Sequence, residues 1–407
     1  MEIKKERLLE RFLRYVSFDS MSDGSAVGKR RPTTKCQEDL LLHLSSELKE
    51  MGLETSIGDD WVLVARLDGN EEYGGIAFMA HVDVAEDVMG NGVKAVVHEM
   101  YDGSDIALGN VVIGRNELEG HDGDAIVTSD GTTLLGADDK AGVAVLVESA
   151  EILSKRDKSS HPTIYYIFTP DEETGSGTSL FPSNILSSVS VLYTFDGGEK
   201  GVVELECFNA AKVTVEISGV ATHLGSARGK MKSALLSASK IVSVLPGSES
   251  PEATDGYYGY YAPLSLSGSV DDAKLEIYLR DFDKENLCYR VNAVESVAKA
   301  IAMLDGTNAS VSIEYSYSNM KSVNEKDENV VKSLESAAKG IGIDLVYSPI
   351  RGGTDGAAIA EKYGVPSPNV FTGGHNYHSL SEWASLSEMC SSLAFLLALV
   401  SFWSGKR

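Results

Sequence analysis

Two hydrophobic periodicities alternate along the first part of the chain. Apolar residues between Leu8 and Val16 recur at helical spacing, and those between Leu40 and Met51 do so again until Gly52, a residue type that commonly ends helices. Short apolar runs follow, and a helix expected over 141–153 separates the later ones. The runs cover residues 61–67, 76–80, 126–127, 164–168 and 189–195. This alternation predicts an α/β domain with a mixed, largely parallel sheet covered by helices.

The pattern of hydrophobic positions changes after about residue 208. Alternating apolar residues over 213–217, 262–266, 274–279 and 309–317 indicate strands, and helical patterns lie between them. The order is β-α-β-β-α-β, the split βαβ arrangement of ferredoxin-like domains. We therefore expect a small α+β domain over 208–317, inserted into a larger domain made of 1–207 and 318–407. The earlier rhythm resumes with helices expected near 326–340, 355–362 and 386–402.

The composition excludes several classes of partner. The 407 residues contain 36 Lys and Arg against 60 Asp and Glu, a formal net charge of −24. Such an acidic chain is not suited to nucleic acid or to an anionic membrane surface. The longest apolar run, residues 393–403, is shorter than the ~20 residues of a membrane span, and no secretory signal is visible. Four widely spaced cysteines without a CxxC pair agree with a cytoplasmic protein.

Polar side chains gather where the predicted strands end. Each group has an ordinary explanation when taken alone, such as a helix cap or a solvated acidic loop. In His81-x-Asp83, residues two apart on a strand point to the same side, so the Asp83 carboxylate can accept the second ring N–H of His81. The other candidates are Asp138, Glu172, Glu173, Asp196 and His378.

Taken together, these side chains are far more specific than any one of them. Two imidazoles and several carboxylates suit two borderline divalent ions such as zinc, with one carboxylate shared between them. Two such ions about 3.5–4 Å apart ionise a bridging water and polarise a carbonyl. A further carboxylate beside that water can accept its proton and pass it to a leaving amine. The pattern predicts hydrolysis of an amide.

The motifs occur in the order found in a known family. They are His81-x-Asp83, Gly136-Ala137-Asp138-Asp139-Lys140, Asp171-Glu172-Glu173-Thr174-Gly175, Asp196-Gly197-Gly198 and Gly374-x3-His378-Ser379-x2-Glu382. From its first helix to its last, the sequence resembles the dizinc peptidases of the M20 family. Three longer stretches, residues 128–140, 204–211 and 351–356, narrow the resemblance to the aminopeptidases that act on tripeptides.

The resemblance implies a role for each matching position. The ligands of two zinc ions per subunit would be His81 and Asp196 for one ion, Glu173 and His378 for the other, and Asp138 for both. Cobalt or manganese would serve as substitutes. Glu172 would be the general base and Asp83 would orient His81. The family also has a cis peptide bond after the bridging aspartate, here between Asp138 and Asp139.

The resemblance also makes the inserted domain a lid that binds a small peptide substrate. His223 would stabilise the tetrahedral oxyanion, while Arg280, Asn319 and Arg351 would bind the peptide backbone or its terminal carboxylate. A bidentate guanidinium suits a planar carboxylate. Arg280 has an alternative, because it could pair with Asp281 or Asp283. In some relatives the lid also forms a homodimer.

The resulting hypothesis is a metallo-aminopeptidase that releases the N-terminal residue of tripeptides by attack of a dizinc-bound water, with Glu172 as base. A dipeptidase or N-acyl amino acid deacylase with the same metals is the nearest alternative. A relative that only binds metal or peptide is more remote, because all ligand positions and Glu172 are present. A nucleotide-binding dehydrogenase is a weaker alternative still, since Gly175-Ser176-Gly177 lacks the third glycine of the dinucleotide motif and the downstream ribose-binding acid.

Overall fold

The computed structural model describes residues 3–405, and the chain folds into two compact units. Unit 1 contains Met1–Leu205, Ser322–Ser348 and Thr354–Arg407, and unit 2 contains Glu206–Lys321 and Pro349–Gly353. The sequence pattern placed the change of domain near 208 and 317. It gave no sign that residues 349–353 belong with the second unit.

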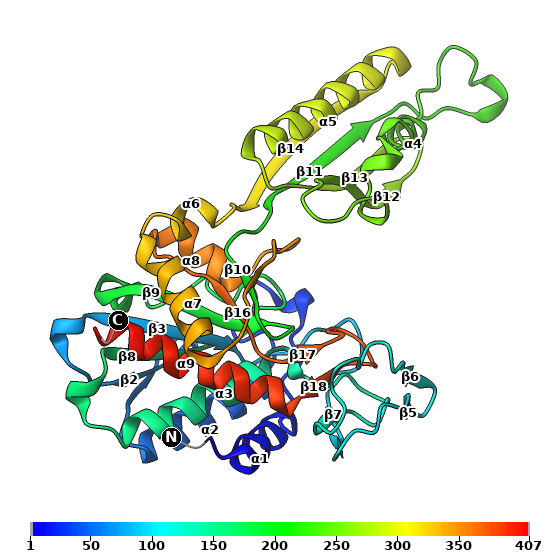
Figure 1. Ribbon diagram of the computed structural model, residues 1–407. Helices are drawn as coiled ribbons and strands as arrows, with labels where there is room; N and C mark the ends of the chain where they lie inside the picture. Colours follow the sequence, from blue (N-terminus) through cyan, green and yellow to red (C-terminus); the bar gives the residue numbers. More distant parts are fainter. Residues whose placement is uncertain (1–2, 406–407) are drawn as a thin grey trace. The chain divides into compact units, whose positions relative to one another are not determined.

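A sheet of eight strands forms the centre of unit 1 (Figure 1). In spatial order its strands are β1 (Glu54–Ile57), β2 (Leu63–Leu67), β8 (Thr163–Thr169), β3 (Gly75–His81), β9 (Val189–Gly197), β16 (Asn369–Phe371), β10 (Val202–Glu204) and β15 (Val346–Tyr347). The four neighbours β8, β3, β9 and β16 run parallel, whereas β1 and β2 are antiparallel additions at one edge. The carboxyl ends of the central strands therefore meet at one edge of the sheet.

Helices cover both faces of this sheet. Along a strand such as β3, alternate residues face opposite layers. Phe78 packs into a core with α3 and α9, and Met79 packs on the other face with Ile359 of α8. The helices are α1 (Lys5–Val16), α2 (Cys36–Glu50), α3 (Ala137–Ser154), α6 (Lys321–Asn324), α7 (Glu328–Ile341), α8 (Asp355–Tyr363) and α9 (Leu386–Trp403). The predicted α/β class is confirmed.

Helix α9 has the length and apolar composition of a membrane span, and within residues 3–405 it is the one helix that does. In the protein 61% of this helix is buried, and Leu393, Leu396 and Leu399 lie in the main core with α3. It is a core helix, as the sequence pattern indicated.

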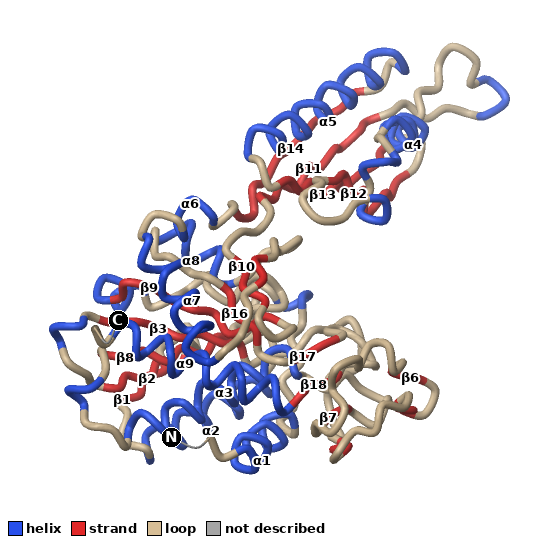
Figure 2. Tube along the Cα trace, in the orientation of Figure 1, coloured by secondary structure: helices blue, strands red, loops and turns tan. Residues whose placement is uncertain are grey.

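The segment between β3 and α3 is mostly loop (Figure 2). It forms the hairpin β5 (Ile106–Leu108) and β6 (Val111–Ile113), and it adds β4 (Val96–His98) and β7 (Ile126–Thr128) to a small antiparallel sheet. The partners β17 (Gly374–His375) and β18 (Trp383–Ser385) come from the C-terminal part of the chain. Strands of two or three residues are too short to show an alternating pattern, so most of this sheet was not predicted.

Unit 2 is an antiparallel sheet with two helices packed on it. In chain order it contains β11 (Asn209–Ser218), α4 (Ala234–Val244), β12 (Tyr260–Gly268), β13 (Asp272–Asp281), α5 (Lys284–Asp305) and β14 (Asn308–Tyr317), and the strand order is β12-β13-β11-β14. This confirms the predicted ferredoxin-like order of elements.

Candidate active site

Four strands and a helix of unit 1 bring the predicted metal ligands together. His81 is the last residue of β3, Glu173 lies in the turn after β8, and Asp196 lies at the end of β9. Asp138 lies in the first turn of α3, and His378 follows β17. Ligands commonly bind outside the carboxyl ends of parallel strands, which is where these five side chains meet.

The five side chains form two groups of three that share Asp138. The potential ligand atoms of each group lie within 4.8 Å of one another. His81 Nε2 is 2.9 Å from Asp138 Oδ1 and 3.3 Å from Asp196 Oδ1. His378 Nε2 is 3.3 Å from Asp138 Oδ2 and 3.0 Å from Glu173 Oε2. Asp138 thus presents one oxygen to each imidazole, the arrangement of a carboxylate shared between two ions.

The charges of this cluster fit divalent cations. Burial, and then the charge of Asp138, raise the pKa of Glu173 to about 7. Burial raises the pKa of Asp196 to about 8, although His81 opposes that shift. Glu173 Oε1 is buried and has no hydrogen-bond partner among the residues that the structure describes. A buried carboxylate oxygen without a partner is costly, and a metal ion would supply the missing contact.

Asp83 lies behind this cluster and contacts it in a different way from the one expected. Its backbone oxygen is the nearer partner of His81 Nδ1, at 3.1 Å, and its carboxylate Oδ1 is 3.4 Å away. The carboxylate accepts the backbone N–H of Glu172 at 3.0 Å and of Glu173 at 3.2 Å. These backbone donors explain the orientation, because buried N–H groups need acceptors. Asp83 therefore holds the turn that carries Glu172 as well as facing His81.

Sequence reasoning gave no role to three further acids near the cluster. Glu382 is buried, and its carboxylate accepts the backbone N–H groups of Leu135, Gly136 and Asp138 at 2.7–3.0 Å. It thereby fixes the turn before α3. Asp139 Oδ2 accepts the His81 backbone N–H at 3.2 Å, and Asp87 Oδ2 is 3.1 Å from His378 Nδ1.

The peptide bond between Asp138 and Asp139 is cis, as the family resemblance implied. For the three acids, the local signals were the presence of Asp139 in the second motif and of Glu382 in the last one. The partners of Glu382 lie more than 240 residues away along the chain, so no spacing could reveal them.

The four predicted substrate-binding residues all belong to unit 2. His223 is exposed, and its Nδ1 accepts the Gly225 backbone N–H at 3.2 Å. The Arg280 guanidinium lies over the rings of Tyr278 and Tyr317, at 5.5 and 5.3 Å. The alternative pairing of Arg280 with Asp281 is not what the structure shows, because Asp281 Oδ2 accepts from Arg290 Nε at 2.9 Å.

Asn319 and Arg351 are engaged within unit 2 itself. The Asn319 side chain accepts from the Cys207 backbone N–H and donates to the Phe282 carbonyl, both at 3.2 Å. The Arg351 guanidinium donates to the carbonyls of Thr254, Gly256 and Tyr258 at 2.8–3.1 Å. In this conformation both side chains fix loops, and their roles toward substrate stay predictions.

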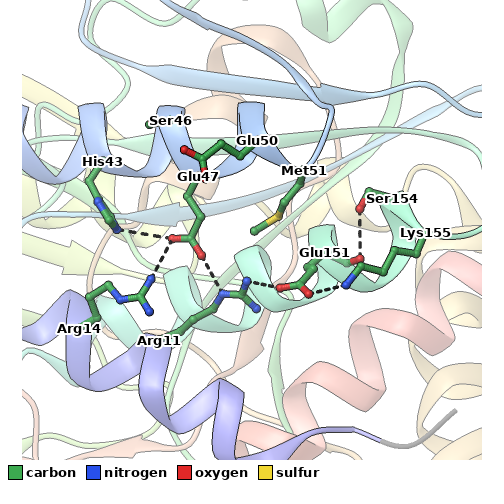
Figure 3. A pocket seen from close by; sticks show the side chains of 10 residues that line it. All are labelled: Arg11, Arg14, His43, Ser46, Glu47, Glu50, Met51, Glu151, Ser154 and Lys155. Atoms are coloured by element: carbon green, nitrogen blue, oxygen red, sulfur yellow. Dashed lines mark hydrogen bonds and ion pairs between the residues drawn. The ribbon is translucent and has the colours of Figure 1, made fainter.

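A pocket of about 610 Å³ lies between α1, α2 and the C-terminal half of α3, and most of its charged side chains are already paired (Figure 3). Arg11 contacts Glu47, Glu148 and Glu151, and its Nε donates to Glu47 Oε1 at 3.0 Å. Burial raises the pKa of Glu151, but the contacts with Lys155 and Arg11 prevail and lower it to about 2. The pocket is lined by a self-contained ion-pair network.

Comparison with known proteins identifies the class of this chain. A family model described as peptidase family M20/M25/M40 matches residues 128–401. The chain belongs to this family and is a hydrolase of the metallopeptidase class. The family resemblance and the enzyme class predicted from the sequence motifs are confirmed.

Within that family the similarity extends along the whole chain to proteins named peptidase T. The peptidase T of Clostridium perfringens is 40% identical over 98% of this chain and 100% of its own length, and that of Bacillus subtilis is 38% identical over 97% and 98%. The crystal structure of aminopeptidase PepT from Bacillus cereus shares the fold, with a TM-score of 0.78 at 24% identity, covering 98% of this chain and 99% of that one.

Proposed function

We propose that this protein is a cytoplasmic aminopeptidase that releases the N-terminal residue of tripeptides and uses two metal ions, zinc in the first instance. The observation that carries the proposal is the pair of imidazole and carboxylate groups joined through Asp138. Its substrate class rests on the similarity to peptidase T along the whole chain.

The residues that would hold the ions follow from the two groups. His81 and Asp196 would hold one ion, Glu173 and His378 the other, and one oxygen of Asp138 would face each. When bound, the two ions supply a Lewis acid for the peptide carbonyl and lower the pKa of the attacking water. The donor set of imidazoles and carboxylates fits zinc, and also cobalt or manganese.

Glu172 is the base in this proposal. It adjoins Glu173, on the turn that the Asp83 carboxylate fixes through two backbone N–H groups. A carboxylate held in this way accepts the proton of the attacking water and returns it to the leaving amine. Glu382 acts indirectly, because it holds the backbone from which Asp138 projects.

Unit 2 provides substrate binding in this proposal. His223 stabilises the oxyanion, and Arg280 and Arg351, with Asn319, bind the peptide backbone or its carboxylate. The Arg280 guanidinium is held by two tyrosine rings, which leaves its planar fork suited to a carboxylate. A homodimer formed through this unit, as in some relatives, is a further part of the proposal, and sedimentation of the purified chain would test whether a dimer forms.

The assigned base is tested by the Glu172→Gln variant. We expect kcat/KM on a tripeptide to fall by about 10²–10⁴ while the metal content is retained, because proton transfer is lost and the ligands are not. Glu199→Gln, at an exposed position after β9, is the matched control and should keep normal activity. A Glu172→Gln enzyme with wild-type turnover would refute the assignment.

The substrate class is tested by three matched compounds: a tripeptide, its N-acetylated form and the corresponding dipeptide. We expect hydrolysis of the tripeptide and rejection of the blocked amine. Preferred cleavage of the acetylated compound would indicate a deacylase, and preference for the dipeptide would indicate a dipeptidase. A metal-loaded protein that cleaves none of them would be a relative that only binds.

A further inference from the structure

A second set of potential metal ligands lies beside the small antiparallel sheet of unit 1. His121 lies in the loop between β6 and β7, His375 ends β17, and Glu388 lies in the first turn of α9. Their ligand atoms lie within 4.8 Å of one another. None of the three belongs to the cluster around Asp138, and no sequence motif singled out His121 or Glu388.

The separations within this trio suit a single ion. Two ligands at 2.0–2.1 Å from a tetrahedral zinc lie about 3.3 Å apart. His375 Nε2 is 2.8 Å from Glu388 Oε2, and His121 Nε2 is 3.9 Å from Glu388 Oε1, so the two values lie on either side of that distance. The imidazole–carboxylate distances in the cluster around Asp138, 2.9–3.3 Å, fall between these two values.

The two imidazoles are held in place by one buried tryptophan. Trp383 stacks on His375, with ring centroids 3.9 Å apart and planes 10° apart, and it meets His121 edge-on at 5.0 Å. His121 Nδ1 is 3.7 Å from Asp124 Oδ2, and that carboxylate is in turn fixed by the hydroxyls of Ser385 and Ser387. Metal-binding histidines usually have such a carboxylate behind the second ring nitrogen.

We propose that His121, His375 and Glu388 bind one divalent transition metal ion of the zinc type. Two imidazoles and a carboxylate form a donor set of zinc sites that leaves a further position for solvent. The three side chains keep 11%, 17% and 10% of their surface exposed, which gives an ion and a water molecule access. None of these three residues takes part in the proposed peptidase mechanism.

The ion would clip the loop after β6, which carries His121, to β17 and the start of α9. His375 precedes His378 by three residues. Asn376, which lies between these two histidines, adopts a positive φ of 55°, and His378 itself adopts one of 58°. Residues other than glycine adopt such angles at a cost, so the surrounding structure must fix this loop. The clip therefore supports the loop that carries one ligand of the other cluster.

Counting bound zinc in the full-length protein tests this site. The chelator-treated chain is dialysed against buffered Zn²⁺, and zinc per chain is measured by mass spectrometry. We expect His121→Gln to bind one ion fewer than wild type. His98→Gln, a partly buried histidine on β4 bonded to Thr128, is the matched control and should bind as many as wild type. Equal counts in wild type and His121→Gln would overturn the proposal and leave an ion-pair cluster.

A fluorescence measurement gives a readout that does not depend on activity. In a Trp61→Phe, Trp403→Phe background Trp383 is the remaining tryptophan, and Co²⁺ at the clip should quench its emission by at least half. Glu388→Gln, which keeps the size of the side chain and serves if His121→Gln does not fold, should lose this quenching. Quenching that persists unchanged in Glu388→Gln would contradict the site.

Discussion

Unit 1 contains two clusters of buried charge associated with the two ends of α3, and their charges are balanced in different ways. Near the C-terminal end, Arg7 and Arg11 neutralise Glu148 and Glu151, and the pKa of Glu151 falls to about 2. Near the N-terminal end, carboxylates meet imidazoles, and burial raises the pKa of Glu173 to about 7. The first cluster carries its own strong cations and is structural. The second needs cations from outside, which marks it as a binding site.

The largest expected effect is on stability when Zn²⁺ is added to the chelator-treated protein, because, of these two clusters, only the one near the N-terminal end of α3 should respond. Free Zn²⁺ at about 1,000 times Kd adds about 4 kcal/mol to the free energy of unfolding for each ion that binds only the folded state. Urea unfolding of the chelator-treated protein with and without Zn²⁺ measures this gain. The Asp138→Asn variant should lose most of the Zn²⁺-dependent gain in stability that comes from the cluster around Asp138. The Arg14→Met variant should retain this gain. A gain unaffected by Asp138→Asn would remove the distinction between the clusters.

Replacement of Arg11, the buried cation of the first cluster, should have the next largest effect on stability. Arg11→Met leaves the buried Glu148 without one of its guanidinium partners, and we expect a loss of about 3–5 kcal/mol in the free energy of unfolding. The control is Arg14→Met, whose side chain is 48% exposed and should contribute less than about 1 kcal/mol. Equal losses from the two variants in urea unfolding would show that the network is not structural.

The pH dependence of Glu151 should be the smallest effect. Its pKa is lowered in the folded state, so its contribution is present above the ordinary value of 4.5 and is lost as the pH falls towards about 2. We expect Glu151→Gln to cost about 1–2 kcal/mol at pH 7, allowing for solvent screening, and clearly less at pH 3.5. Thermal unfolding at both values measures this. An equal cost at the two pH values would contradict an electrostatic origin.

Without metal, the stability contributed by the cluster around Asp138 should change with pH in the direction opposite to that of Glu151. The pKa of Glu173 is raised in the folded state, so the ionised form is disfavoured there. In the absence of metal, the contribution of this residue to stability is greatest below pH 4.5 and is lost as the pH rises through about 7.

Much of the site could be predicted because its residues stand at ends of elements that the hydrophobic pattern reveals. The ends of β3 and β9 were expected within a residue or two, and they place His81 and Asp196 at one edge of the sheet. Asp138 opens α3, whose apolar length the sequence also shows. Local patterns define such positions, and the topology of a parallel sheet then brings them together.

The remaining features depend on contacts that no local pattern contains. Glu382 reaches the turn at Leu135 from a distant part of the chain, and Arg11 reaches Glu148 from a helix face that looks solvated in sequence. The trio of His121, His375 and Glu388 forms around strands of two and three residues, where alternation cannot be seen. Tertiary packing, not propensity, creates all three.

The position of His378 and Glu382 late in the chain has a consequence for the order of synthesis. Domains fold largely as they emerge from the ribosome. When unit 2 has been made, the growing chain already contains His81, Asp138, Glu173 and Asp196. The strands β16 to β18 and Glu382, which holds the turn before α3, are still missing. The nascent protein therefore passes through most of its translation without the complete cluster around Asp138, which forms only after His378 has been added.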